Sequence, residues 1–196
     1  MVNNDNSVNI ASDQRRYHHG NLREALIAAG FKALAERASD DFSMREVARK
    51  VGVSATSVYR HFPDKKAFVE ALCSEGSQLL AEAQRKAMAA KGGGQDGFDA
   101  SGLSYVQFAL ENPALFRLMS IAFPAEASLG GSDDPAMQEL LTNVTTLMPR
   151  GSTARQREIR ALHAWSVVHG IAMLVLTGRI PNDDELISAI IRTPIS

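Results

Sequence analysis

The sequence predicts an all-α fold in which a small N-terminal domain is joined by a long helix to a larger helical domain. Three observations predict it. The chain of 196 residues is 45% hydrophobic, its apolar residues recur at helical spacing along most of its length, and alternation of β-branched and aromatic residues is rare. We expect a disordered tail at residues 1–16, a first domain at 17–66 and a second domain at 67–196.

The first domain is expected to contain three short helices. Each begins after a residue that can cap it: Asn21, Ser43 or Ser54. Glu24 and Glu46, three residues after Asn21 and Ser43, complete capping boxes. Residues 39–41 break the first helix, Gly52 supplies a turn after the second, and the third spans residues 55–61.

The long helix and the second domain follow the same rules. Pro63-Asp64 begins a helix, with the proline near its first turn, that runs to about residue 91, where Gly92-Gly93-Gly94 forms a flexible connector. Start signals at Asn112-Pro113, and at Asn182 with Glu185, support two of the later helices. The apolar periodicity predicts these later helices at 98–111, 113–121, 134–148, 154–178 and 183–192.

Charge is distributed unevenly along the chain. The net charge is −1, yet residues 15–66 hold eleven basic and six acidic side chains, a local charge of +5. This asymmetry is typical of a protein in which one module meets phosphate, although a solvated charged surface gives the same pattern.

Composition also bears on compartment. The single cysteine, Cys73, cannot form an internal disulfide, which suits a reducing cytoplasm, and we expect a buried helix thiol there rather than a redox sensor. Residues 1–14 lack the apolar run of a signal peptide. The apolar stretch 161–177 is shorter than a membrane span and favours a buried helix, so we expect no membrane association.

Residues 43–62 predict a helix, a three-residue turn and a second short helix, which is the pattern of a DNA-binding helix-turn-helix. Val47, Ala48, Val51, Val53 and Val58 would hold the two helices together. The exposed face of the second helix would then carry short polar groups, an aromatic ring and a guanidinium, which suit base edges and phosphates. An ordinary helical hairpin with a polar solvent face remains the alternative.

Two strings strengthen the DNA-binding interpretation. FSMREVARKVGVS at 42–54 and VYRHFPDKKAF at 58–68 resemble the DNA-binding domain of the TetR (tetracycline-repressor) family of transcriptional regulators. In the second half, Trp165 to Gly170 resembles the Trp-x-x-x-His-Gly stretch of one ligand-binding subgroup of that family.

The resemblance implies a set of DNA-binding residues. Thr56 and Tyr59 would face bases or nearby backbone, Tyr59 and His61 phosphates, and Lys65 the backbone, whereas Ala55 offers only methyl contact. Ser43 would mainly cap its helix, and Arg15 and Arg16 would reach the minor groove or a phosphate, or stay solvated. The full set is Arg15, Arg16, Ser43, Arg45, Ser54, Ala55, Thr56, Ser57, Tyr59, Arg60, His61 and Lys65.

The second half is expected to form a dimer and a sensor. Helix 154–178 is apolar almost all round, so one face would meet its own domain and another a second copy of the chain, together with helix 183–192, unless both belong to a monomer core. The resemblance implies a pocket for a hydrophobic small-molecule effector, although aromatic stripes and His169 also suit a plain core. The candidate lining residues are Tyr105, Phe108, Phe116, Met119, Phe123, Met137, Leu141, Trp165 and His169.

These inferences favour a ligand-responsive repressor that binds a palindromic operator as a homodimer. A constitutive DNA-binding protein and a helical enzyme are the alternatives, and the sequence shows no set of nucleophile, base and orienting group. We expect no cofactor and no metal, since the adjacent His18 and His19 lack carboxylate or thiolate partners.

Overall fold

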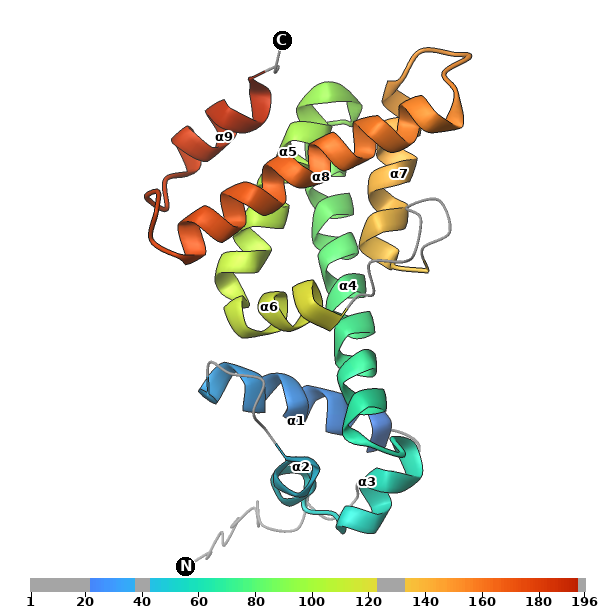
Figure 1. Ribbon diagram of the computed structural model, residues 1–196, viewed down its shortest axis with the longest axis vertical. Helices are drawn as coiled ribbons and strands as arrows, with labels where there is room; N and C mark the ends of the chain where they lie inside the picture. Colours follow the sequence, from blue (N-terminus) through green and yellow to red (C-terminus); the bar gives the residue numbers. More distant parts are fainter. Residues whose placement is uncertain (1–21, 38–42, 123–132, 194–196) are drawn as a thin grey trace, which may run out of the picture.

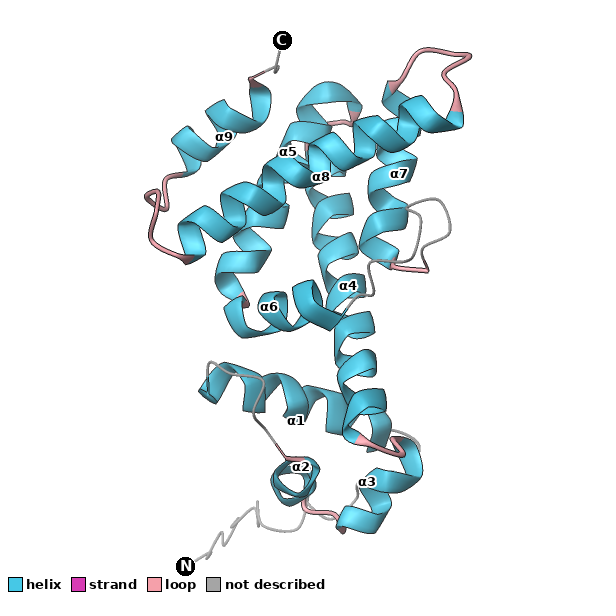
Figure 2. Ribbon diagram, in the orientation of Figure 1, coloured by secondary structure: helices cyan, strands magenta, loops and turns pink. Residues whose placement is uncertain are grey.

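The computed structural model describes residues 22–37, 43–122 and 133–193, and within these ranges it contains nine helices and no strand (Figure 1, Figure 2). The predicted all-α fold class is confirmed. The helices are α1 (Leu22–Arg37), α2 (Met44–Val51), α3 (Ala55–His61), α4 (Lys65–Ala90), α5 (Gly94–Glu111), α6 (Pro113–Ala122), α7 (Pro135–Leu147), α8 (Ala154–Leu176) and α9 (Asp184–Arg192).

The helices form two parts that follow one another along the long axis of the molecule. Helices α1, α2 and α3 lie together at one end, and α5 to α9 form the larger body at the other (Figure 1). Helix α4 belongs to both parts, because its first turns pack against α1 and its later turns pack against α5, α6 and α7. The fold therefore contains one rigid element that joins the two parts.

Several helix starts are capped, and at Ser43 and Ser54 the capping residue is the one that the sequence predicts. In each of these caps a side-chain oxygen accepts a hydrogen bond from a backbone N–H in the first turn, which satisfies a donor that the helix itself cannot. The capping residues are Ser43, Ser54, Asp64, Asp134 and Thr153.

Two predicted starts are displaced by one residue. Asp183, not Asn182, caps α9, and its carboxylate accepts hydrogen bonds from the N–H groups of Glu185 and Leu186. Pro63 precedes the cap Asp64, so it lies just outside the first turn of α4. Hydrogen bonds to a charged carboxylate are stronger than those to a neutral amide, which favours Asp183 as the cap. Asn21, the predicted cap of the first helix, lies outside the described residues.

The predicted flexible connector at residues 92–94 is instead a tight turn. The three glycines all have positive φ angles, and α5 begins at Gly94, four residues before the predicted start at 98. The N–H of Gly93 bonds the carbonyl of Met88 at 3.1 Å. Glycine adopts positive φ at little cost, so consecutive glycines reverse the chain directly and lay α5 against α4.

The junction between the N-terminal helices and α4 is closely packed. Phe68 and Leu72 of α4 are fully buried, and a Cβ added to Gly30 of α1 would lie 2.8 Å from atoms of both. The Phe68 ring also meets the Phe62 ring edge-on at a centroid distance of 4.8 Å. The side chains of α4 therefore leave no space beside Gly30 of α1 for a larger residue.

Helix α8 is less buried than predicted for residues 161–177. It is the one helix among the described residues that is long and apolar enough to cross a membrane by length and composition, and only 22% of that window is buried. Such a helix is weak evidence for a membrane, because core helices of soluble proteins pass the same test. Its exposed apolar residues belong to the site described next.

Candidate functional site

The turn between α2 and α3 fixes the direction of α3. Gly52 ends α2 in the left-handed region at φ 77°, and its N–H bonds carbonyls of the last turn. The N–H of Val53 then donates to the carbonyl of Ala48 at 3.0 Å. A β-carbon is disfavoured at this backbone angle, so glycine makes the tight reversal possible. The predicted helix-turn-helix between residues 43 and 62 is thus present in the structure.

Helix α3 is held by its inner side and presents the other side to solvent. Val58 is fully buried, and Ser54 caps the helix by accepting from the N–H of Ser57 at 3.2 Å. The hydroxyls of Ser54 and Ser57 also lie 2.9 Å apart. The exposed side chains on this helix are Thr56, Tyr59, Arg60 and His61, and the exposed fraction of Tyr59 is 47%.

The remaining predicted DNA-binding residues surround α3. Ser43 caps α2 by accepting from the N–H of Glu46 at 3.1 Å, and Arg45 is exposed in the first turn of that helix. Ala55 is half-buried at the start of α3, and Lys65 is exposed in the first turn of α4. These residues come from three elements at the same end of the molecule (Figure 1). Arg15 and Arg16 lie outside the described residues.

Two other basic side chains of this end have structural partners. The guanidinium of Arg23 lies 5.4 Å from the centroid of the Phe62 ring, and the ammonium of Lys50 pairs with the carboxylate of Glu36. Both contacts join α1 to later segments. Arg23 and Lys50 therefore help to hold the N-terminal helices together.

The larger body contains a cavity of about 1100 Å³, lined by residues of α4 to α9. This volume is at the upper end of what small-molecule sites usually offer. Six of the nine predicted lining residues line it: Tyr105, Phe116, Met119, Met137, Trp165 and His169. Phe108 is buried and Leu141 is half-buried, and neither lines the cavity. Phe123 lies outside the described residues.

A hydrogen-bonded chain of three side chains crosses one wall of this cavity. The indole N–H of Trp165 donates to the hydroxyl oxygen of Tyr105 at 3.1 Å. The same hydroxyl lies 3.0 Å from Nδ1 of His169, and the imidazole tautomer decides which of these two groups donates.

Burial keeps the side chains of Tyr105 and His169 uncharged. Desolvation raises the pKa of Tyr105 to about 12, against a smaller opposing contribution from its hydrogen bond with Trp165. Desolvation also lowers the pKa of His169 below its usual 6.5. At neutral pH the cavity wall therefore presents a phenol and a neutral imidazole, in keeping with an apolar or weakly polar ligand.

Sequence reasoning missed several lining residues, and Gln84 is the most informative. Its exposed fraction is 6%, it lines the cavity from α4, and its side-chain oxygen has no hydrogen-bond partner among the described residues. A pattern in the sequence could have found it. Phe68, Leu72, Gly76 and Leu80 mark the buried stripe of α4 at intervals of four residues, and Gln84 continues that stripe with a polar group.

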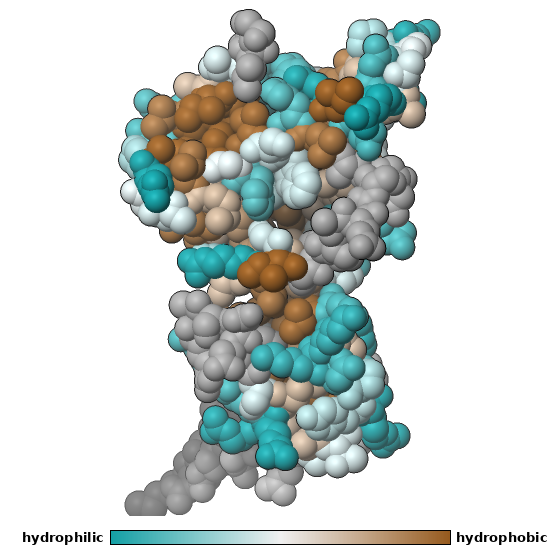
Figure 3. Space-filling view, in the orientation of Figure 1, coloured by the Kyte–Doolittle hydropathy of each residue, from teal (hydrophilic) through white to brown (hydrophobic). Residues whose placement is uncertain are grey.

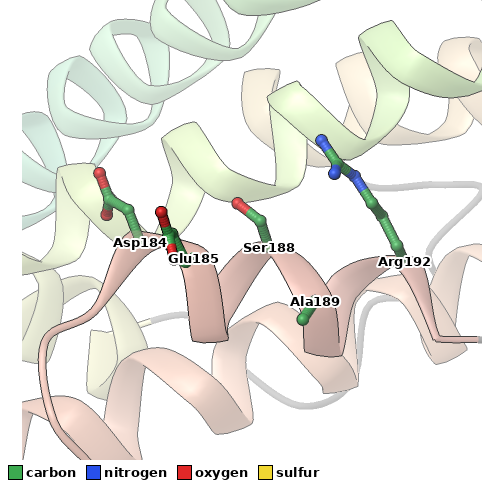
Figure 4. A pocket seen from close by; sticks show the side chains of 5 residues that line it. All are labelled: Asp184, Glu185, Ser188, Ala189 and Arg192. Carbon is green, nitrogen blue, oxygen red and sulfur yellow. The ribbon is translucent and has the colours of Figure 1, made fainter.

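A second, shallower depression of about 360 Å³ lies on α9. Figure 4 shows Asp184, Ser188 and Arg192 pointing toward α5. The carboxylate of Asp184 accepts a hydrogen bond from Gln107, and Arg192 lies 3.9 Å from the carboxylate of Asp99. These contacts tie both ends of α9 to α5, so the depression is explained by helix attachment. No group of three or more metal-ligating side chains occurs within the described ranges.

Helices α8 and α9 share an exposed apolar surface. Figure 3 shows apolar residues gathered over this part of the molecule. Large apolar side chains there are between 36% and 52% exposed: Ile159, Leu162, Trp165, Met173, Leu174, Leu186 and Ile190. Contiguous exposed apolar surface of this kind marks an interaction site in soluble proteins.

Comparisons with known proteins agree with this arrangement. Residues 26–72 match the model of bacterial regulatory proteins of the tetR family, and residues 98–193 match the tetracyclin repressor-like C-terminal domain. A solved protein of unknown function from Rhodococcus sp. RHA1 is 28% identical, with 90% of this chain and 95% of that chain covered and a TM-score of 0.71.

Two more distant solved structures share the fold. A tetR-family transcriptional regulator from Streptomyces coelicolor is 23% identical, with 88% of this chain and 78% of that chain covered and a TM-score of 0.63. A TetR family transcription regulator from Marinobacter aquaeolei VT8 is 15% identical, with 88% and 92% covered and a TM-score of 0.59. With a matched regulatory domain in each half, the chain carries the N-terminal and C-terminal domains of the TetR family and has the fold of a TetR-family transcriptional regulator.

Proposed function

We propose that this protein is a cytoplasmic, ligand-responsive transcriptional repressor that binds a palindromic operator as a homodimer and is released by a hydrophobic small molecule. The observation that carries the proposal is the joint presence of an exposed, rigidly held α3 and a cavity of about 1100 Å³, connected by α4. A ligand can change DNA binding only if its site is coupled to the DNA-binding helix, and α4 contacts both parts of the molecule.

In this proposal α3 enters the major groove of the operator. Tyr59 and Thr56 face the base edges, while Arg60, His61 and Lys65 meet the phosphates. Tyr59→Ala should then weaken binding to the operator by about 1–3 kcal/mol and relax its sequence preference. Lys65→Ala should weaken binding to all duplexes alike and lower the salt slope by about one unit.

Fluorescence anisotropy with labelled duplexes measures both effects. DNA that flanks the protein's own gene is the first operator candidate, and a scrambled duplex of equal length serves as control. Far-UV circular dichroism checks that both variants keep their helices. Unchanged operator affinity in both variants would contradict the placement of α3 in the groove.

The dimer is proposed to form through α8 and α9. One helix-turn-helix contacts few bases, so two copies are needed to read two half-sites. The exposed apolar residues of α8 and α9 supply a surface that a second copy would cover, burying Met173, Leu174 and Ile190. This would also account for the low burial of α8 in the single chain.

Analytical ultracentrifugation tests the dimer with a matched pair of variants. Leu174→Glu places a charge on the proposed interface and should yield monomers. Ile121→Glu makes the same change on α6, where the isoleucine is 79% exposed and outside this surface, and should remain dimeric. A monomeric wild-type chain, or equal behaviour of the two variants, would contradict the interface.

Helix α4 is proposed to transmit the ligand's effect. Its residue Leu80 lines the cavity, while Phe68 and Leu72 are packed against Gly30 of α1. A ligand that favours one position of α4 would thereby favour one spacing of the two α3 helices in the dimer. Loss of operator binding at saturating ligand is the test; a binding ligand that leaves operator affinity unchanged would favour a constitutive DNA-binding protein instead.

A further inference from the structure

The carboxamide of Gln84 has chemistry that the folded chain does not use. Its oxygen is closed to solvent and has no hydrogen-bond partner among the described residues. A buried polar atom without a partner is rare in folded proteins, because it loses its bond to water and gains nothing in return. The neighbours one turn away on the same helix face, Leu80 and Ala81, are apolar and buried.

The position of this amide connects it to the cavity. Gln84 lies on α4 and lines the same cavity as Leu80, Tyr105 and Trp165. The last side-chain torsion of glutamine is soft, so the amide can turn its oxygen toward a ligand at little cost. The chain thus has an unsatisfied acceptor at the edge of a largely apolar cavity.

We propose that Gln84 determines the specificity of the cavity by accepting a hydrogen bond from a neutral ligand that has an apolar body and one hydroxyl or N–H donor. This inference rests on the proposed function, since it defines the chemistry of the effector. A neutral donor is favoured over a cation, because an uncharged amide cannot compensate a buried charge. The carboxylates that line the cavity already have partners in the chain: Asp99 accepts a hydrogen bond from Gln95, Asp134 from the N–H of Met137 and Glu158 from Arg155. The phenol of Tyr105 and the neutral imidazole of His169, which line the same cavity, likewise carry no charge at neutral pH.

A comparison between two glutamines shows why Gln84 is unusual. Gln95 also lines the cavity, but it is exposed and its amide nitrogen donates to the carboxylate of Asp99 at 2.7 Å. The amide of Gln95 therefore has a hydrogen-bond partner and access to water. The side-chain oxygen of Gln84 has no hydrogen-bond partner among the described residues and no access to water. The matched control for Gln84→Met is Gln78→Met, because Gln78 is exposed on the same helix and does not line the cavity.

The experiment uses two probes that share a biphenyl body and differ in whether its oxygen carries a hydrogen or a methyl group. 4-Phenylphenol carries a hydroxyl, and 4-methoxybiphenyl has the same rings with that donor removed. Binding to the full chain is measured by calorimetry and by the fluorescence of Trp165, which is the single tryptophan and lines the cavity. We expect the wild type to prefer the phenol by about tenfold, the effect of one well-made hydrogen bond to a buried acceptor.

The variants separate a specificity role from a structural role. In Gln84→Met the preference should fall to about twofold or less, and the midpoint of thermal unfolding should stay equal or rise because an unsatisfied buried amide is removed. Gln78→Met should keep the wild-type preference. Equal affinity of the wild type for both probes, binding of neither, a preference that survives in Gln84→Met, or a fall in its unfolding midpoint would each overturn the inference.

Failure here is distinguishable from failure of the proposed function. Operator binding by the ligand-free protein is measured on the same samples by fluorescence anisotropy. If operator binding is intact while the probes show no preference, only the role of Gln84 is overturned. If no duplex is bound specifically, the proposed function itself fails.

Discussion

The hydroxyl of Tyr105 forms hydrogen bonds with two side chains, Trp165 and His169, that lie 60 and 64 residues further along the sequence. Removal of this hydroxyl gives the sharpest test of the cavity wall. Tyr105→Phe keeps the ring, which meets Phe116 edge-on at a centroid distance of 5.6 Å, and deletes only the oxygen. The Trp165 N–H and His169 Nδ1 then lose the partners that they hold at 3.1 Å and 3.0 Å.

The cost follows from the exposure of the three groups. Trp165 is 36% exposed, so its N–H can be hydrated when the hydroxyl is gone, whereas Tyr105 is only 7% exposed and His169 is half-buried, so Nδ1 of His169 is less accessible to water. One hydrogen bond is therefore largely replaced by water and the other is lost inside the wall. We expect the free energy of unfolding to fall by about 1 kcal/mol, which lowers the unfolding midpoint of a chain of this size by about 2–4 °C.

The assay is thermal and urea unfolding followed by far-UV circular dichroism. Wild type and variants are compared at one protein concentration, because the stability of a dimer depends on concentration. Tyr59→Phe is the matched control, since it deletes the same oxygen from an exposed ring and should change stability by less than about 0.5 kcal/mol. Equal stability of Tyr105→Phe and Tyr59→Phe would refute the hydrogen-bonded chain as drawn.

Three further outcomes are expected. Gly30→Ala should raise the free energy of unfolding by about 1 kcal/mol through helix propensity and lower it by about 2 kcal/mol through overpacking against Phe68 and Leu72. Urea unfolding should therefore show a net loss of stability of about 1 kcal/mol. A net gain would contradict the close packing of α1 against α4. The neutral form of His169 is favoured in the folded chain, so the unfolded chain binds more protons below pH 6.5. Stability should therefore fall as pH drops below 6.5, and this part of the slope should be missing in His169→Gln. Burial and nearby carboxylates raise the pKa of Cys73 to about 11, so iodoacetamide should alkylate it slowly in the native protein and rapidly in urea, and fast native labelling would show that the thiol is open.

Local signals in the sequence predicted the helix-turn-helix closely. Ser43 and Ser54 bond backbone groups only three residues away, and Gly52 reverses the chain through its own backbone angle. Such features depend on neighbours in sequence and on little else. The exposure of Thr56 and Tyr59 followed directly from the burial of Val58, because these residues share one short helix.

The cavity could be predicted only in part. Apolar and aromatic residues such as Phe116 and Met119 were expected in the second half, but periodicity does not decide between a filled core and a hollow one. The partners of Tyr105 lie 60 and 64 residues away, so their meeting depends on how α5 and α8 pack. The glycine turn at 92–94 was mistaken for a connector because composition does not distinguish a loose run from a tight reversal.

The most direct test of the account is a selection of binding sites from a pool of random duplexes, performed with the wild-type chain and with Tyr59→Ala. The account predicts enrichment of an inverted repeat whose half-site centres lie about 34–36 Å apart, or a multiple of that distance, with base preference reduced in the variant. Enrichment of no sequence, or of a single site without two-fold symmetry that Tyr59→Ala reads equally well, would contradict it.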